Sequence, residues 1–121
     1  HLTRDAILAA STDSNLYPEL PNFGGMNRAF LVADHADGAT LGGPGIVDGR
    51  GHLMRRAHTG GRHPGTRLIA GRDSSRLTIE DITLLDSFAW AGHFQNCTDL
   101  TIRRVAVINE INHPGWSPKG A

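Results

Sequence analysis

Three segments of the chain repeat one pattern of apolar and polar residues, and this repeat restricts the fold more than any other feature. The segments cover residues 37–49, 75–87 and 98–110, and they align without gaps. A repeat of roughly twenty to fifty residues indicates a solenoid, in which each unit buries its apolar side only against its neighbours. The aligned positions form three columns: Leu41, Ile79 and Ile102 in the first, Ile46, Leu84 and Val107 in the second, and Asp48, Asp86 and Asn109 in the third.

The step between equivalent positions gives the length of the repeating unit. Ile102 follows Ile79 by 23 residues, which suits one coil of a β-helix, whereas Ile79 follows Leu41 by 38 residues. The excess falls in a glycine-rich, basic stretch, so we expect a loop near 50–66 that protrudes from the wall. A second loop is expected near 14–28, where two prolines and a Gly-Gly pair interrupt the apolar pattern.

The remaining sequence consists of short apolar runs separated by Gly, Asp, Asn and Ser. This pattern, with fifteen glycines and little helical periodicity, indicates strands and turns rather than helices. Asp or Asn in the third column suits a tight turn after a strand, and we interpret it as structural rather than catalytic. We therefore expect an all-β fold, one parallel β-helix domain over 1–121 with about three to four coils, truncated at both ends.

Composition excludes several classes of partner. Twelve Lys and Arg residues balance twelve Asp and Glu residues, and basic residues cluster only in pairs, so neither nucleic acid nor a membrane is expected as a partner. No apolar run approaches the roughly eighteen residues that cross a bilayer. Cys97 is the single cysteine, which excludes an internal disulfide. The chain begins at His1 rather than Met, which is compatible with the loss of an N-terminal signal peptide.

Several motifs resemble glycoside hydrolase family 28, the polygalacturonases and their relatives. Residues 40–51, TLGGPGIVDGRG, resemble the family's G-x-G-x-I-D-G-x-G segment. Residues 1–13, followed by Leu16-Tyr17-Pro18, resemble the family's first coil. Residues 77–102 resemble a longer family stretch with five characteristic residues in register: Ser87, Trp90, His93, Cys97 and Ile102.

The resemblance covers nearly the whole chain, with three departures. Asp81 stands where the family usually has Gly, Asp86 where it has Asn, and Phe88 where it has Pro, which suggests a divergent bacterial type. The resemblance implies a right-handed, single-stranded parallel β-helix of the pectin-lyase-like kind. It also implies a secreted or periplasmic protein that uses no cofactor, and we expect a monomer.

The activity that the resemblance implies is hydrolysis of polygalacturonate or a related pectic polysaccharide. An inverting glycosidase needs one carboxylic acid and one carboxylate base. In the family these groups, with an Asp-Asp pair and an Arg-x-Lys motif, follow the Trp-His-Cys coil, and neither motif occurs in this sequence. We therefore assign no catalytic residue, expect the catalytic residues after Ala121, and expect this fragment alone to be inactive.

Trp90 and His93 are the candidate site residues. They lie three residues apart in the coil that precedes the expected catalytic strand, so they could line the substrate groove or support it from behind. Packing of a coil corner is the more common role for such a pair.

Other residues suggest sites less strongly. Histidines 52, 58 and 63 have spacings that fit no zinc-ligand pattern, so we expect solvated loop residues and no metal site. Arginines 55, 56, 62 and 67 could pair with galacturonate carboxylates, although solvation at the surface is the favoured interpretation. Cys97 is expected to be a small buried residue rather than a nucleophile.

Two alternatives to a hydrolase stay open. A pectate-lyase-like enzyme on the same scaffold would need a carboxylate cluster for calcium, and none is evident in the aligned coils. A non-catalytic carbohydrate-binding or structural β-helix would have the same fold, because fold alone does not determine function. In each case the expected partner is a polysaccharide.

Overall fold

The computed structural model describes residues 1–13, 16–17, 19–20, 28–53, 66–88 and 90–109. This part of the chain contains short strands and one helical turn at residues 51–53, and it has no helix of the length and apolar character that crossing a membrane requires. The strands are β1 (Ile7–Ala9), β2 (Ala29–Asp34), β3 (Thr40–Gly42), β4 (Ile46–Asp48), β5 (Arg67–Arg72), β6 (Thr78–Glu80), β7 (Thr83–Leu85), β8 (Gly92–Gln95), β9 (Thr101–Arg103) and β10 (Ala106–Ile108).

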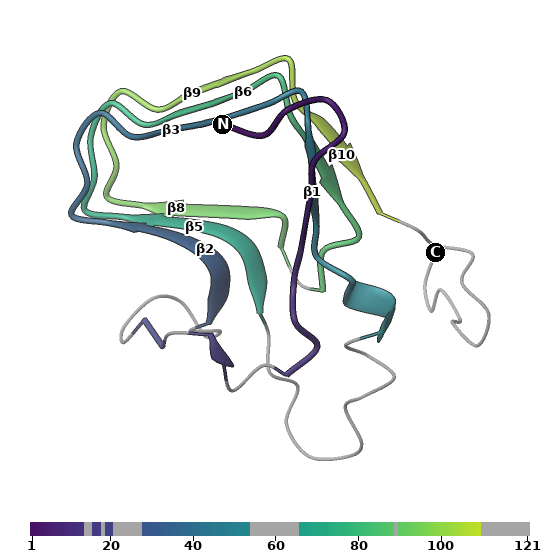
Figure 1. Cartoon of the computed structure of the whole chain (residues 1–121). Helices are drawn as coiled ribbons and strands as arrows, with labels where there is room; N and C mark the ends of the chain where they lie inside the picture. The colour runs from purple at the N-terminus through teal and green to yellow at the C-terminus, as the bar shows by residue number, and fades with distance from the viewer. Residues whose placement is uncertain (14–15, 18, 21–27, 54–65, 89, 110–121) are drawn as a thin grey trace, which may run out of the picture.

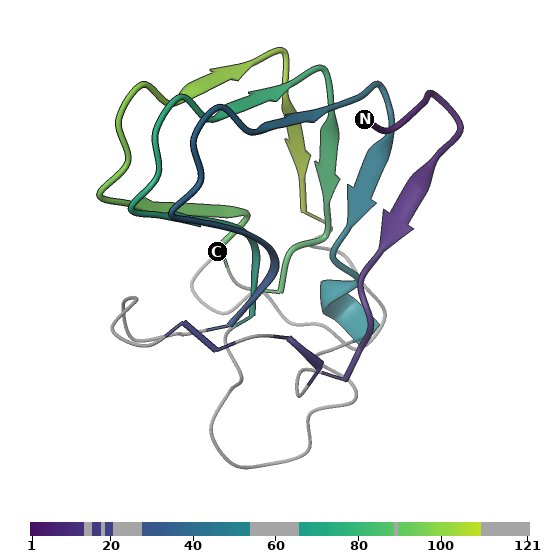
Figure 2. The same cartoon turned by 60° about the vertical axis from the view of Figure 1, so that its left-hand side comes forward.

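The strands form three parallel sheets, and each sheet takes one strand from every coil. Their orders are β1-β4-β7-β10, β2-β5-β8 and β3-β6-β9. The chain visits the three sheets in turn and then stacks its next strand beside the one it made a coil earlier (Figures 1 and 2). This is a parallel β-helix, so the predicted fold class is confirmed.

The predicted first column is confirmed, whereas the second is wrong at one position. Leu41 pairs with Ile79, and Ile79 pairs with Ile102. Leu84, however, pairs with Val47 rather than with Ile46, which lies opposite Thr83. The turn between β3 and β4 contains one residue more than the turn between β6 and β7, and an alignment without gaps cannot show this insertion.

The same insertion shifts the third column. Asp48 lies opposite Leu85, and Gly49 takes the place equivalent to Asp86, because the Gly49 amide donates to the Leu85 carbonyl (2.8 Å). Asp86 and Asn109 do share a column, since the Asp86 amide donates to the carbonyl of Ile108 (2.7 Å). Asp48 still serves its turn, because its Oδ1 accepts a hydrogen bond from the Arg50 amide (2.9 Å).

The predicted loops near 14–28 and 50–66 lie largely outside the described residues. The undescribed positions within them are 14–15, 18, 21–27 and 54–65.

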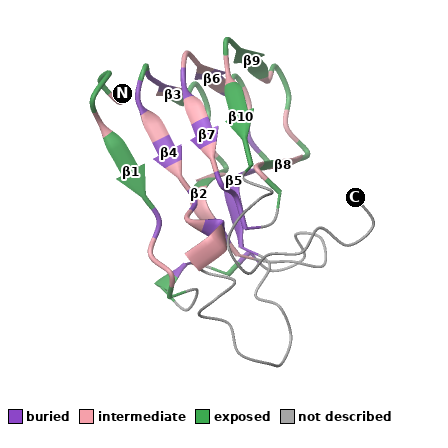
Figure 3. Ribbon diagram, turned by 90° about the vertical axis from the view of Figure 1, so that its right-hand side faces the viewer, coloured by how far each residue is buried: buried purple, intermediate pink, exposed green. Residues whose placement is uncertain are grey.

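The apolar core depends on contact between coils. Leu84, which has coils on both sides, is 5% exposed, whereas its column neighbour Val107 in the last described coil is 52% exposed. Figure 3 shows the same trend along the sheet, where β4 and β7 carry buried residues and β1 and β10 are exposed. Burying one such aliphatic side chain contributes about 1.5–3 kcal/mol, so each coil is stabilised by its neighbours. The central cluster contains Val47, Leu68, Ile69, Ile79, Ile82 and Leu84.

Cys97 is more exposed than the sequence predicts. Its side chain is only half-buried, and its Sγ donates to the Gln95 carbonyl at 3.5 Å. The expectation of a buried cysteine is therefore wrong in the described part of the chain, because no described coil lies beyond the one that carries Cys97.

The corners between sheets place residues in the left-handed backbone region. Asp and Asn tolerate this region better than other non-glycine residues, because their short polar side chains bond locally. His35, Asp73 and Asn96 occupy one corner in successive coils, and Asn96 Nδ2 donates to Asp73 Oδ1 (2.6 Å). The non-glycine residues with φ between 49° and 57° are His35, Arg50, Asp73, Arg76, Asp81, Asp86, Asn96, Asp99 and Arg104.

Glycines in the predicted family motif allow neighbouring coils to approach closely. A Cβ added to Gly43 would lie 2.5 Å from the Asp81 carbonyl oxygen of the next coil. A Cβ added to Gly45 would lie 2.6 Å from Leu2 Cβ of the preceding coil. Gly49 and Gly51 similarly face backbone atoms of Asp86 and Ser87. The motif that resembles a family signature therefore has a physical role in coil stacking.

Ion pairs link the outer corners of neighbouring coils. The Arg76 guanidinium donates to both carboxylate oxygens of Asp37 (2.7 and 2.6 Å). Hydrogen bonds from Arg72, Arg76 and Arg104 lower the pKa values of Asp34, Asp37 and Asp81 respectively below their ordinary range. The inter-coil pairs are Arg72 with Asp34, Arg76 with Asp37, Arg103 with Glu80 and Arg104 with Asp81.

Adjacent glycines provide a test of close coil approach. We expect Gly43→Ala to destabilise the fold by about 2–4 kcal/mol, because a rigid backbone oxygen of Asp81 must move. Gly42→Ala is the control, since its Cβ would meet Glu80 Cγ at an ordinary 3.8 Å. Urea unfolding followed by circular dichroism measures both, and equal losses for the two variants would contradict this packing.

The corner ion pairs predict acid sensitivity. Because the folded-state pKa values of Asp34, Asp37 and Asp81 lie below 3.8, their stabilisation is complete above that value and disappears as the pH falls through the folded-state values. We expect Tm to decrease below about pH 4, and to decrease less in high salt, which screens exposed pairs. Arg76→Gln should reduce the acid-dependent part of the loss. Identical pH profiles for this variant and the wild type would argue against the pairing.

Candidate functional site

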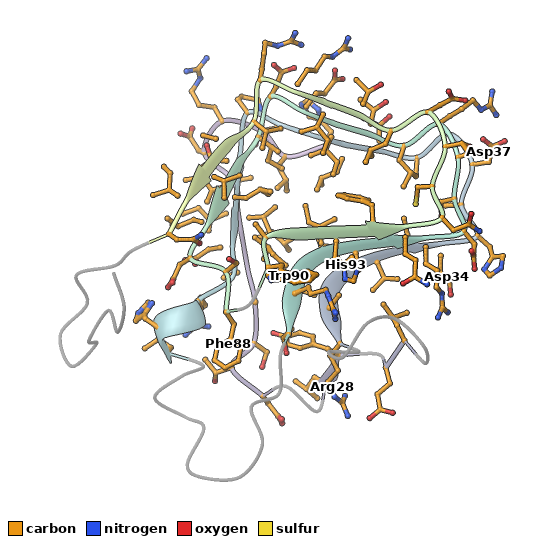
Figure 4. The ribbon with its side chains drawn as sticks, turned by 180° about the vertical axis from the view of Figure 1, so that it is seen from behind. Arg28, Asp34, Asp37, Phe88, Trp90 and His93 are labelled. Carbon is orange, nitrogen blue, oxygen red and sulfur yellow. The ribbon has the colours of Figure 1, made fainter. Side chains whose placement is uncertain are left out.

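Trp90 and His93, the two predicted site residues, lie together at the beginning of β8. Their ring centroids are 4.9 Å apart and their planes meet at 70°, an edge-to-face arrangement (Figure 4). Trp90 is 59% exposed, while His93 is half-buried. Trp90 is therefore the exposed member of an ordered aromatic pair.

The sheet β2-β5-β8 determines where this pair lies. His93 shares an outward column with Ala70 and Val32, because side chains alternate between the two faces of a strand. Its neighbour Phe94 points inward, where its ring covers Gly71: a Cβ at Gly71 would meet the Phe94 ring at 2.7 Å. His93 thus lies on the outer face of the sheet, and Phe94 lies in the core.

Arg67 completes the cluster and was not predicted to do so. Its Cζ lies 5.6 Å from the centroid of the Trp90 ring, a cation–π geometry. The side chain is only 2% exposed, so the expectation of a solvated Arg67, or of an Arg67 pairing directly with a galacturonate carboxylate, is wrong. The other arginines of that expectation, Arg55, Arg56 and Arg62, lie outside the described residues.

The cluster affects proton binding at its members. Burial, and secondarily the positive charge of Arg67, lower the pKa of His93 below its ordinary value of 6.5. Burial also lowers the pKa of Arg67. His93 is therefore a neutral imidazole at neutral pH, and Arg67 provides the positive charge of the cluster.

A second histidine cluster was missed by sequence reasoning. His52, expected to be solvated, donates its backbone amide to Asp86 Oδ2 (3.2 Å), and its Nδ1 contacts the same oxygen. Asp86 is 3% exposed, so this is a buried carboxylate rather than a turn residue alone. The replacement of the family's Asn by Asp86 was the available signal, but nothing in the spacing connected it with His52. Residues 58 and 63, the other histidines of that group, lie outside the described part.

Asp34, His35 and Asp73 have potential ligand atoms within 4.8 Å of one another. These atoms already have protein partners. Arg72 donates to both oxygens of Asp34 (3.2 and 2.8 Å), and Asn96 donates to Asp73. The three residues also belong to the corner columns that stack the coils, so their proximity follows from the fold and does not by itself indicate a cation site.

Several carboxylates of the described residues form ion pairs or hydrogen bonds with side chains elsewhere in the wall. Asp37, Glu80 and Asp81 pair with arginines of neighbouring coils, and Asp86 is bound by His52. These contacts suit structural roles, and the expectation that the catalytic acids lie after Ala121 stays a prediction.

Known proteins resemble the chain in sequence and in fold. No family model matches the chain. A probable polygalacturonase from Vitis vinifera is 29% identical over 126 residues, which cover 93% of this chain and 26% of that protein. The resemblance to polygalacturonases is confirmed. The chain spans about a quarter of the length of this curated relative.

A solved structure agrees on the fold. The crystal structure of a "putative glycosyl hydrolase" from Parabacteroides merdae superposes with a TM-score of 0.71 at 24% identity. The match covers 88% of this polygalacturonase-like chain and 51% of the solved one. At this identity the likeness supports the parallel β-helix and carries no information on substrate.

The His52 and Asp86 contact can be tested against an exposed counterpart. His52→Ala should destabilise the fold by about 1–3 kcal/mol, because a buried carboxylate loses a hydrogen-bond donor. His35→Asn is the control: the His35 imidazole contacts Asp34 (2.7 Å), but its side chain is 72% exposed, Arg72 still binds Asp34, and Asn tolerates the left-handed backbone of this position. We expect a change below about 0.5 kcal/mol for the control in urea unfolding at pH 7. A His35→Asn loss as large as that of His52→Ala would refute the structural importance of burial at Asp86.

Proposed function

We propose that this chain is part of a longer glycoside hydrolase that cleaves polygalacturonate or a related pectic polysaccharide. The observation that carries the proposal is the similarity to a probable polygalacturonase along 93% of the chain. The parallel β-helix supports the same interpretation, as do the coil contacts of the glycines in the segment 40–51 that resembles the family.

The reaction would be a hydrolysis with inversion of the anomeric centre. One carboxylic acid protonates the leaving glycosidic oxygen, and a carboxylate about 6.5–9.5 Å away activates the attacking water. The family resemblance suggests that these residues follow Ala121. Because the strands repeat in the order of the three sheets, we expect the next strand after β10 to pair with β8. It would then lie beside the Trp90 and His93 coil.

This arrangement gives Trp90 a role in the proposed groove. An exposed indole offers a flat apolar surface on which a sugar ring can stack, and its edge remains in contact with His93. That Trp90 and His93 line the groove, rather than only filling a coil corner, stays a prediction.

The decisive experiment is to extend the gene past the codon for Ala121 and assay the longer product. We expect an Asp-Asp pair in the continuation and release of reducing ends from polygalacturonate, with inversion detected by proton NMR of the new anomers. Substituting the newly encoded Asp pair by Asn should abolish turnover. A product without these carboxylates, or one that binds polygalacturonate without cleaving it, would favour a non-catalytic β-helix.

In the same product, Trp90→Ala should raise KM roughly five- to tenfold, because one aromatic contact is lost. Leu16→Ala is the control, since Leu16 is also exposed (69%) and has no contact with the cluster in the described structure. Equal kinetic constants for the two variants would exclude Trp90 from the groove.

A further inference from the structure

Arg67 is a large cationic side chain inside the wall. It begins β5, where its backbone amide donates to the Arg28 carbonyl of the preceding coil (2.9 Å). At 2% exposure it is among the most buried large side chains described. Removing a guanidinium from water is unfavourable unless other groups compensate, so a buried arginine at this position calls for a specific explanation.

The indole of Trp90 provides part of that compensation. The Arg67 Cζ lies 5.6 Å from the ring centroid, and a desolvated cation interacts more strongly with an aromatic face than an exposed one. The two side chains come from neighbouring coils, at positions one 23-residue step apart. Coil stacking therefore brings them together without any special loop.

The backbone around Trp90 is fixed to β5 on both sides of this contact. The Leu68 amide donates to the Trp90 carbonyl, and the Ile69 amide donates to the Ala91 carbonyl, both at 3.0 Å. With the backbone held, the remaining freedom of Trp90 is rotation of its side chain. Arg67 and His93 restrict that rotation from two directions.

We propose that Arg67 is a positioning residue, whose buried guanidinium holds the Trp90 indole against His93 and so fixes the edge of the proposed substrate groove. The part of this edge in sugar binding rests on the proposed function, whereas the positioning of Trp90 does not. Arg67 itself does not touch the sugar, because it is almost fully buried.

The planar guanidinium is essential to this arrangement. Lysine would keep the positive charge but lacks the flat group that stacks on an aromatic ring. Methionine has a similar length and removes the charge. The variants Arg67→Lys and Arg67→Met therefore separate stacking geometry from electrostatics.

His93 reports the electrostatic part directly. Among the described charged groups, Arg67 is the one that acts on the His93 imidazole, and its charge lowers the pKa of that ring together with burial. Loss of the charge in Arg67→Met should raise the pKa of His93, while Arg67→Lys should keep it lowered. The titration therefore shows that the charge of Arg67 lies near His93, while the ring contacts and Kd show whether Arg67 positions Trp90.

The experiment uses the longer product of the extended gene, with its newly encoded Asp pair substituted by Asn so that the probe, trigalacturonate, is bound and not cleaved; in this background the chain with Arg67 serves as the wild type. Titration of His93 by NMR gives its pKa, nuclear Overhauser contacts between the Trp90 and His93 rings give the geometry, and calorimetry gives Kd. We expect a wild-type His93 pKa below 6.5, ring contacts that weaken in both variants, and Kd raised roughly 2- to 30-fold in both. Val32→Ala, on the same outward column but two coils away from β8, is the control.

The outcomes separate the two proposals. If the wild type does not bind trigalacturonate but the pKa and ring contacts change as expected, the positioning role stands and the pectic substrate is wrong. If ring contacts and Kd are unchanged in both folded variants, the positioning role is wrong. Should Arg67→Met fail to fold, the ring contacts and Kd of Arg67→Lys still decide the question.

Discussion

Contact between successive coils is the constraint on which the rest of this structure depends. No coil encloses a core by itself, and the difference between Leu84 and Val107 in one column shows how much a second neighbouring coil adds. Three further groups of residues keep neighbouring coils at the distance that this contact needs. Gly43 and Gly45 let backbones approach, residues such as Asp73 and Asn96 turn the corners, and arginines bind carboxylates one coil away. The zero net charge of the chain is consistent with this use of its charges in pairs across coils.

The sequence predicted the wall well because the wall is periodic. The 23-residue step located Ile79 and Ile102 correctly, since both lie at the centre of equivalent three-residue strands, β6 and β9. The prediction failed at Ile46 and Asp48, where the turn around Pro44 contains one additional residue. A single insertion moves a strand by one position without disturbing an apolar pattern in which Ile46 and Val47 are both aliphatic. Local composition could not distinguish the two registers, whereas hydrogen bonds to the next coil do.

For the candidate site, too, the prediction succeeded where the coils are periodic and failed where they are not. Trp90 and His93 were predicted from the resemblance, but Arg67 was interpreted as one of several surface arginines. The coil step could have found it, because Arg67 precedes Trp90 by the same 23 residues that separate Ala70 from His93. The contact of His52 with Asp86 had no such signal, since it spans the irregular 38-residue step. Periodicity therefore identifies neighbours only where no insertion intervenes.

A solenoid separates the residues that build its wall from those that act at its surface. Inward positions such as Ile69 and Phe94 must fill the core, and corner positions must turn the chain. Trp90 continues the column of Ala29 and Arg67, which are 0% and 2% exposed, whereas Trp90 itself is 59% exposed. Exposure rises along this column as it does from Leu84 to Val107, because no described coil lies beyond the one that carries Trp90. Backbone hydrogen bonds, a buried cation and an imidazole nevertheless hold the ring. Fixing a side chain costs conformational entropy, and here polar contacts with one neighbouring coil offset that cost in a way that an aliphatic side chain such as Val107 cannot.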